Sequence, residues 1–457
     1  MTSSAESPSV DKLARRGAIW TIGSFGASSL LRFGSNLILT RLLVPELFGL
    51  MALTYVFIAG LQMFSDVGVG VSIIRHKRGD EREFLDTAWT IQAMRGGILW
   101  IACLLLAYPA SLVYQEPRML WLLPLVGLNT VLAGFNSTAL YTLNRRLAVR
   151  ELAFFELSGQ MLSTSVIVVW AWFNPSIWAL VAGGLANSVY QLLLSHAFSK
   201  RIGKGLLNQF AWEKSAAREI LSFGAWIFFS TAITFFAEQA DKLILGKVLG
   251  LSLLGVYGVA LTFADLPRSV TLALCGKVIL PALSLISDQP RPTIRAKLVK
   301  KRRPLLIVMA LGLAVMACYG DLMIKLLYDE RYQQAAWMLP LLTVGIWPRL
   351  LCSTIESILM AIGKPQYNAA ANLSRFLCTT VGIWIGYSLF QIPGAVIGVA
   401  LNDLCYYCVV AYGLRREGFS AFKDDLMATA LFLCSLVLLV LSRSFLGFGT
   451  PIDTMVF

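Results

Sequence analysis

The sequence predicts an all-α fold, a polytopic bundle of transmembrane helices. The chain of 457 residues has a mean hydropathy of +0.69, with 57% apolar and only 14% charged residues, outside the range of soluble globular domains. Its apolar residues gather in segments of about 20 residues, the length that one helix needs to cross a bilayer. Since the two-residue alternation of barrel strands is absent, helices are the structure that satisfies every backbone group in lipid.

Thirteen segments are long and apolar enough to be spans. They lie at residues 17–40, 47–74, 87–114, 119–143, 152–173, 176–199, 220–246, 251–286, 304–328, 335–362, 366–390, 393–414 and 425–446. The polar start of the chain is followed by an apolar segment that is too long for a cleavable signal and lacks a small-residue cleavage site. We therefore expect this segment to be retained as the first transmembrane helix.

The basic residues predict the orientation. Most of the 39 Lys and Arg residues lie in alternate loops, of which 297-KLVKKRR-303 is the densest, whereas Arg41, Arg118, Lys247 and Arg331 are the few in the other loops. Because basic loops stay in the cytoplasm, the N terminus is predicted to be cytoplasmic. The run at 297–303 is interpreted as a topology anchor, with contact to anionic lipids as the alternative. The net charge of +13 therefore requires no nucleic-acid partner.

An internal repeat predicts two lobes. The segment 38-ILTRLLVPELFGLMALTYVF-57 matches 244-ILGKVLGLSLLGVYGVALTF-263, so that the first expected span corresponds to the seventh. An even displacement gives both six-helix lobes the same orientation, related by a pseudo-two-fold axis along the membrane normal, with substrate between them. The expected organisation is a cytoplasmic tail (1–16), an N-lobe (17–199), a cytoplasmic linker (200–219), a C-lobe (220–414), an extra helix (425–446) and a short tail (447–457). Residues 206–219 of the linker are a candidate interfacial helix.

Charged residues inside the apolar segments are the candidate functional residues. A charge at the bilayer centre costs about 2.5–3.5 kcal/mol, so such side chains usually face an interior cavity. The arginines of this kind are Arg32, Arg95, Arg268, Arg349 and Arg375. On the first helix, Ser24, Ser28, Arg32 and Asn36 recur every four residues and share one face. Because Arg binds phosphate bidentately, we expect these arginines to form a cationic cavity for an anionic substrate.

The acidic residues in the same segments are candidates for H⁺ or Na⁺ coupling, because burial makes a carboxyl group harder to ionise. They are Asp66, Asp241, Asp265, Glu356 and Asp403. Two pairs on one helix face could simply neutralise each other, Glu238 with Lys242 and Asp265 with Arg268. Arg32, Arg95 and Arg375 have no acidic residue three or four positions away, and pairing across helices with Asp66 or Asp403 remains an alternative to substrate binding.

Motifs of enzymes and metal sites are absent from the sequence. No phosphate-binding loop, nucleophile elbow or H-E-x-x-H pattern occurs, and His76 and His196 have no metal-ligand spacing. All eight cysteines lie in apolar segments, and the C-x-x-C of Cys405 and Cys408 is interpreted as helix packing. We therefore expect no catalytic residue, metal or cofactor apart from the coupling ion.

Two segments carry a family resemblance. Residues 39-LTRLLVPELFGLMALTYVFIAGLQMFSDVGVGVSIIR-75 and 141-YTLNRRLAVRELAFFEL-157 resemble the polysaccharide-synthesis (Wzx-type) flippases of the multidrug, oligosaccharidyl-lipid and polysaccharide exporter superfamily. The resemblance implies a transporter that carries undecaprenyl-diphosphate-linked repeat units across the bacterial inner membrane, for exopolysaccharide, capsule or O-antigen, by ion-driven alternating access. It also implies membrane lipids, a polysaccharide polymerase and other assembly proteins as partners. Members commonly have an even number of spans, unlike the thirteen predicted here.

Two other functions remain alternatives. A multidrug exporter of the same superfamily would be expected to have a cavity richer in Asp and Glu than in Arg. A membrane glycosyltransferase or polymerase usually needs a sizeable external loop or domain. The short loops predicted on the external side argue against such an enzyme.

Overall fold

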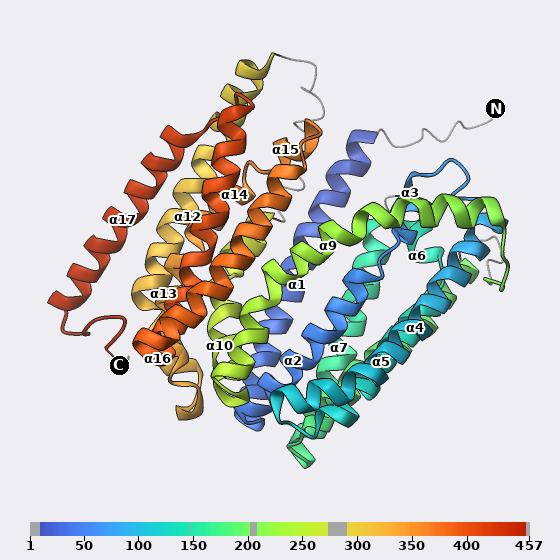
Figure 1. Ribbon diagram of the computed structural model, residues 1–457, viewed down its shortest axis with the longest axis horizontal. Coiled ribbons are helices and arrows are strands. Elements are labelled where there is room, and N and C mark those ends of the chain that lie inside the picture. Colours follow the sequence, from blue (N-terminus) through green and yellow to red (C-terminus); the bar gives the residue numbers. More distant parts are fainter. Residues whose placement is uncertain (1–9, 147, 202–207, 273–289, 454–457) are drawn as a thin grey trace, which may run out of the picture. The chain divides into compact units, whose positions relative to one another are not determined.

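The computed structural model describes residues 10–146, 148–201, 208–272 and 290–453, and this part of the chain is helical and contains no strand (Figure 1). The all-α prediction is therefore confirmed. The helices are α1 (Val10–Leu42), α2 (Pro45–Phe64), α3 (Val69–Arg75), α4 (Arg82–Tyr114), α5 (Met119–Gly134), α6 (Ala139–Arg145), α7 (Val149–Phe173), α8 (Ile177–Arg201), α9 (Lys214–Val248), α10 (Leu251–Ala264), α12 (Arg291–Leu327), the 3₁₀ helix η1 (Glu330–Tyr332), α13 (Ala335–Gly345), α14 (Trp347–Ser353), α15 (Ser357–Ala361), α16 (Gln366–Arg416) and α17 (Phe422–Phe445).

Among the described residues, seven helices are long and apolar enough to cross a membrane, or up to nine if each of two bent pairs counts as one span. The pairs are α5 with α6, bent by 62°, and the segments Glu330–Gly345 and Trp347–Ala361, bent by 43°. One of the seven, α16, contains two of the expected spans, and α1 and α9 are not among the seven. The total of thirteen stays a prediction. Residues 273–286 of the expected eighth span, like 1–9, 202–207 and 454–457 of the expected tails and linker, lie outside the described residues.

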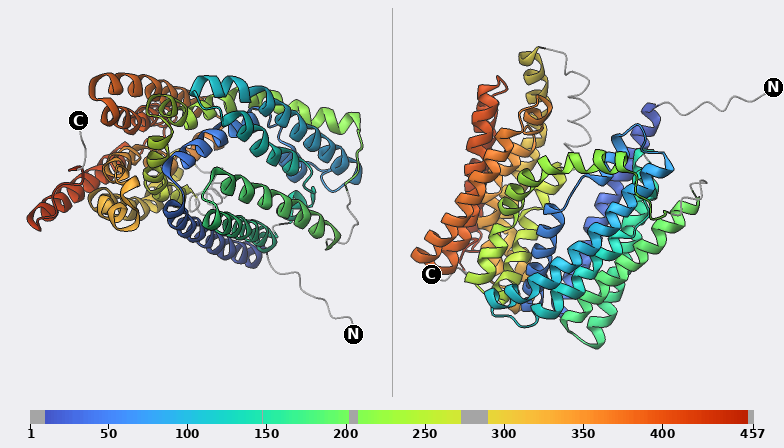
Figure 2. Two further views of the ribbon diagram at one scale, coloured as in Figure 1. Left: turned by 90° about the horizontal axis from the view of Figure 1, so that it is seen from below. Right: turned by 45° about the vertical axis from the view of Figure 1, so that its right-hand side comes forward.

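The chain divides into two compact units, residues 1–43 with 54–231 and residues 44–53 with 232–457. In the first unit, α4 packs along α5, α7 packs against α1 and α8, and α5 contacts α8 (Figures 1 and 2). Glycine allows the close approach of α4 and α5, because a methyl group added at Gly96 would collide with the carbonyl of Thr130. The Thr130 hydroxyl donates to the Gly96 carbonyl at 3.1 Å across the same contact.

The linker of the first unit differs from the predicted interfacial helix. Residues 208–213 form no regular secondary structure, and α9 begins only at Lys214. Polar side chains of α4 hold this segment, because the backbone N–H groups of Gln209 and Glu213 donate to Asp86 and Thr87, each at 3.1 Å. The prediction of an interfacial helix over 206–219 is therefore wrong for 208–213, where side chains of α4 replace helical acceptors.

In the second unit, α12 packs against α13 and α17, α10 packs against α13, and α13 and α14 contact α16 (Figure 2). The helix α16 folds back on itself at Phe390 and Gln391, and Gln391 has a positive φ of 52°. Its two arms touch through glycine. A methyl group added at Gly386 would collide with the Gly394 carbonyl, and the same holds further along for Gly382 and Gly398. This backbone contact sets the register of the hairpin.

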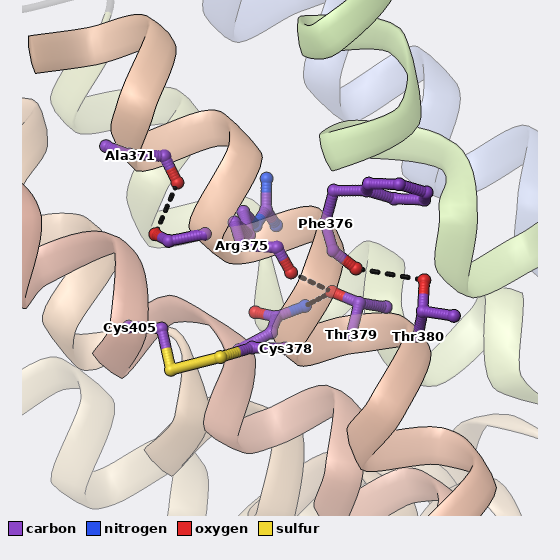
Figure 3. The surroundings of a disulfide bond; sticks show 9 residues. Ala371, Arg375, Phe376, Cys378, Thr379, Thr380 and Cys405 are labelled. Atoms are coloured by element: carbon purple, nitrogen blue, oxygen red, sulfur yellow. Dashed lines mark hydrogen bonds between the residues drawn. A yellow bond between two sulfur atoms is a disulfide. The ribbon is translucent and has the colours of Figure 1, made fainter.

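The hairpin also joins two cysteines. Cys378 and Cys405, on opposite arms of α16, form a disulfide one helical turn from Arg375 (Figure 3). The prediction that the Cys405 and Cys408 motif only packs is wrong for Cys405, because the fold-back brings a cysteine from another expected span against it. Cys408 remains a free thiol and is exposed.

Candidate functional site

The register of the α16 hairpin places opposite charges face to face. The guanidinium Nε of Arg375 lies 2.8 Å from Asp403 Oδ1, and the side chains are only 15% and 8% exposed. Beside this pair, Asn402 donates to the Thr379 hydroxyl at 2.9 Å, and that hydroxyl donates to the Arg375 carbonyl at 2.8 Å (Figure 3). The alternative that Arg375 pairs across helices with Asp403 is therefore confirmed as its structural arrangement.

This ion pair belongs to a larger group of polar side chains, which we call the second-unit cluster. Its charged members and their closest polar neighbours are Asp241, Tyr257, Asp265, Arg268, Arg375, Asn402 and Asp403, which help line a cavity of about 50 Å³. Such a volume admits a few water molecules or a small cation and is far too small for a sugar. The second-unit cluster can therefore hold an ion or a proton relay, whereas a glycan would have to bind elsewhere.

Asp241 is the carboxyl group of the cluster with the least compensation. The Tyr257 hydroxyl donates to its Oδ2 at 2.6 Å, while its Oδ1 is buried and accepts no hydrogen bond. In the part of the chain that the structure describes, no Lys, Arg or His lies within ion-pair distance of it, in contrast to Asp403. A buried carboxylate with neither a cation nor a full set of hydrogen bonds is costly. Asp241 is therefore suited to take up a proton or a small cation.

Arg268 lies at the edge of the same cavity and connects two acidic residues. It pairs with Asp265 at 3.0 Å, which confirms the expected pair, and lies 3.9 Å from Glu238. In place of the expected pair between Glu238 and Lys242, the Lys242 ammonium donates to Gln239 at 2.9 Å. The sequence could not reveal that Arg268 takes the place of Lys242 beside Glu238, because Arg268 comes from another segment of the fold.

Arg349 and Glu356 form a separate compensated group in the second unit. The two are 3.3 Å apart, and the Tyr406 hydroxyl donates to the same carboxylate at 2.8 Å. The guanidinium carbon of Arg349 lies 3.9 Å from the centre of the Tyr406 ring, close enough for a cation–π interaction. The charge of Arg349 is thus balanced by a carboxylate and an aromatic face, an arrangement typical of a structural ion pair.

Arg32 lies in a different environment in the first unit. Its side chain is exposed, and its guanidinium donates to the Ser28 hydroxyl at 3.4 Å. Ser28 in turn donates to Gln160 of α7 at 2.6 Å, and the Gln160 amide returns a bond to the Ser28 carbonyl at 3.1 Å. Among the residues described, none forms an ion pair with Arg32. The predicted stripe on α1 therefore joins α7 through neutral groups and leaves one positive charge uncompensated.

Arg95 of α4 contacts the C-terminal end of α2. Its Nε donates to the Ser65 hydroxyl at 2.9 Å and its Nη2 to the Gln62 carbonyl at 2.6 Å, while Asp66 lies at the limit of an ion pair, 4.0 Å away. Asp66 also accepts from the backbone N–H of Gly68 at 3.0 Å. A basic side chain that binds the last carbonyls of a helix stabilises its C terminus. This geometry favours a structural function for Arg95.

Buried ion pairs of α17 were not among the predicted site residues. Arg443 binds Asp321 of α12 at 2.7 Å with both side chains 1% exposed, and Arg302 binds Asp425 at 2.6 Å. Tyr257 and Asn402 of the second-unit cluster were missed as well. Asn402 could have been suspected as the neighbour of Asp403, but no spacing in the sequence connects the other side chains to their partners.

Seven or more helices that are long and apolar enough to cross a membrane, counted over the described residues, define a multi-pass membrane protein. The profile of the family described as polysaccharide biosynthesis protein matches residues 38–337, and the chain belongs to this family. The chain is 24% identical over 367 residues to the lipopolysaccharide biosynthesis protein WzxC of Escherichia coli (strain K12), covering 80% of this chain and 74% of that protein. It is 23% identical over 421 residues to the succinoglycan biosynthesis transport protein ExoT of Rhizobium meliloti (strain 1021), covering 91% and 81%.

Solved structures share the fold. The lipid II flippase MurJ in an inward closed conformation matches with a TM-score of 0.70 at 13% identity, over 92% of this chain and 91% of that one. An inward-facing multidrug resistance transporter of the MATE family and MOP superfamily matches with a TM-score of 0.59 at 13% identity, over 94% of this chain and 97% of that one. The resemblance to exporters of this superfamily is thus confirmed. The protein is a transporter, and the alternative of a glycosyltransferase or polymerase is wrong.

Proposed function

We propose that this protein is a flippase for polyprenyl-diphosphate-linked oligosaccharides in the bacterial inner membrane, supplying exopolysaccharide, capsule or O-antigen synthesis. The observation that carries the proposal is Arg32, an exposed guanidinium whose described partner is a neutral hydroxyl. A diphosphate offers the bidentate acceptor that this guanidinium lacks. The names of the relatives, which include lipopolysaccharide and succinoglycan biosynthesis, support a glycan substrate.

The five candidate arginines differ in the functions that we propose for them. Arg32 is the first choice for contact with the diphosphate. Arg268, Arg349 and Arg375 are each compensated by carboxylates, and Arg95 holds the end of α2, so their contribution to substrate binding is smaller. A substrate phosphate reaching any of these would have to displace an existing acceptor.

Ion coupling is proposed to occur at the second-unit cluster. Asp241 has an oxygen that accepts no hydrogen bond, next to a cavity of about 50 Å³. Within the described residues, no group of three or more Asp, Glu, Cys or His side chains has the spacing of a metal site. In this proposal Asp241 takes up the coupling ion, H⁺ or Na⁺, in one state of alternating access and releases it in the other.

The test uses a deletion strain that lacks this protein. Loss of the flippase should cause lipid-linked repeat units to accumulate on the cytoplasmic face of the inner membrane, and the native chain should clear them. The control is the Arg146→Ala variant, which removes an exposed arginine of a predicted cytoplasmic loop and should also clear the lipid-linked repeat units. If no lipid-linked repeat units accumulated and polymer export remained normal in the deletion strain, the proposal would be wrong.

Export of cationic drugs is the second candidate function of this protein. The carboxyl of Asp241 favours it, because an uncompensated carboxylate attracts cations as well as protons. This function predicts that the deletion strain becomes sensitive to cationic dyes while its repeat units are exported normally. The flippase function predicts the reverse.

A further inference from the structure

The second unit contains another pocket, outside the second-unit cluster. It has a volume of about 590 Å³ and lies where α12, α14, the second arm of α16 and the start of α17 meet. Its inner wall is apolar and includes the buried side chains of Leu351, Cys352 and Ile355. The volume is within the range of pockets that hold small molecules or single lipid chains. An apolar pocket of this size is suited to a hydrocarbon ligand.

The rim of this pocket is basic. Arg295, Arg415 and Lys423 line it, and all three are exposed. None of them takes part in an ion pair with any residue described in the structure. The rim thus carries three positive charges that the protein itself does not balance.

The acidic residues near the rim do not neutralise it, because each is already paired. Asp425 lies 2.6 Å from Arg302, and Asp424 lies 2.7 Å from Arg303. Glu417, the third, lies 3.6 Å from Arg291. These three carboxylates are therefore paired with other arginines and do not balance the positive charges of the rim.

Aromatic side chains complete the rim. Tyr412 is 61% exposed and Phe422 is 57% exposed, and both line the pocket. Exposed aromatic residues beside Lys and Arg are typical of the level of lipid headgroups. The basic residues of this end of the unit also belong to the loops that the charge pattern predicts to be cytoplasmic.

We propose that this pocket binds one anionic phospholipid of the cytoplasmic leaflet. The phosphate is held by Arg295, Arg415 and Lys423, and one acyl chain lies along the apolar wall toward Leu351 and Ile355. Basic pockets between helices on the cytoplasmic side are suited to anionic headgroups. A lipid bound there connects α17 with α12 and α16 and so stabilises this corner of the unit. The inference is independent of the proposed transport function.

The test measures lipid binding to the full-length purified protein by native mass spectrometry, with phosphatidylglycerol and, separately, zwitterionic phosphatidylethanolamine as probes. Phosphatidylglycerol should bind the native chain with a stoichiometry of one. The triple variant Arg295→Gln, Arg415→Gln, Lys423→Gln should bind it on the order of 100-fold more weakly, since each basic residue near an anionic lipid contributes about 1 kcal/mol. Phosphatidylethanolamine should not distinguish the two chains.

A matched control removes the same charge from outside the pocket. Lys300, Lys301 and Arg416 are exposed, and they do not line the pocket. The triple variant Lys300→Gln, Lys301→Gln, Arg416→Gln should bind phosphatidylglycerol within about 3-fold of the native chain, the scale expected for weak long-range attraction. An equal loss of binding in this control would overturn the proposal, because the attraction would then be nonspecific.

A second variant tests the apolar part without altering charge. Ala411 lines the pocket, and Ala411→Trp should fill the space of the acyl chain and weaken binding of phosphatidylglycerol at least 10-fold. Unchanged binding in this variant would contradict a lipid inside the pocket. Displacement of phosphatidylglycerol by one equivalent of undecaprenyl phosphate would also overturn the proposal, because the pocket would then belong to the lipid carrier.

Discussion

Arg32 of the first unit and Arg375 of the second both lie in apolar helices, but the structure treats their charges differently. Arg375 contacts Asp403 at 2.8 Å in a largely buried setting, whereas Arg32 is exposed and donates to a hydroxyl at 3.4 Å. The comparison teaches that an arginine in an apolar segment does not by itself indicate a ligand site. What separates the two is whether the fold supplies a carboxylate.

The largest expected effect is on ion coupling in the second unit. Asp241→Asn keeps the shape of the side chain and can still accept the Tyr257 bond, but it cannot take up a proton. We expect transport driven by a pH gradient to fall at least 10-fold in proteoliposomes, since general proton-transfer groups contribute on the order of 100-fold or more.

The control for this variant is Glu330→Gln, which removes an exposed carboxyl of the second unit. It should leave the response to the gradient unchanged. An Asp241→Asn protein whose transport still follows the imposed pH gradient would assign coupling to another group.

The next effect is on stability and follows from the ion pair. Asp403→Ala leaves Arg375 in a largely buried site without its carboxylate, and we expect the free energy of unfolding to fall by about 3 kcal/mol. Thermal unfolding in detergent measures this change. The double variant Arg375→Met, Asp403→Leu should recover most of the loss, because an apolar pair leaves no charge unbalanced. A double variant as unstable as the single one would show that the pair itself is required.

A smaller effect is expected in the α16 hairpin. Gly386→Ala forces a methyl group against the Gly394 backbone and should lower the free energy of unfolding by about 1–3 kcal/mol. Gly312→Ala on α12 is the matched control, because nothing lies within 4 Å of the added methyl group there. That variant should be neutral or slightly stabilising. Equal behaviour of the two variants would contradict the close contact that sets the hairpin register.

The smallest effect concerns the linker. Arg78 lies 2.8 Å from Glu213 and lowers the pKa of that carboxyl below its ordinary value of 4.5. Since the folded-state pKa is the lower one, the pair stabilises the linker fully above pH 4.5 and is lost as the pH falls through the folded-state pKa. Proteolysis of residues 208–213 by an acid-active protease should therefore accelerate below that pH. In Glu213→Gln this acceleration should be absent, and a persistent acceleration would assign it to another group.

The sequence predicted the fold class, several charged residues of the cluster and one pair, Asp265 with Arg268, and it left the pairing of Arg375 with Asp403 open as an alternative. Apolar segments of about 20 residues follow from composition, and Asp265 with Arg268 follows from helical spacing. The pair of Arg375 and Asp403 depends on where α16 turns, which is determined by Gln391 and by glycine contacts between distant positions.

The prediction for the linker was wrong for a related reason. Residues 206–219 were a candidate interfacial helix, but backbone donors of 208–213 bind Asp86, Thr87 and Thr90 of α4. The disulfide between Cys378 and Cys405 likewise depends on the register of the hairpin. Local pattern could not reveal these long-range contacts, because each requires the tertiary arrangement to be known.

The most direct test of the central claim compares transport and stability in Arg32→Ala. Purified native and variant chains are reconstituted, and translocation of a polyprenyl-diphosphate-linked oligosaccharide is followed beside thermal unfolding. We predict a loss of transport of at least 10-fold with a change in unfolding free energy within about 0.5 kcal/mol, as is usual for an exposed side chain. Normal transport by a stably folded Arg32→Ala protein would contradict the account, because an uncompensated guanidinium would then have no function in binding the diphosphate.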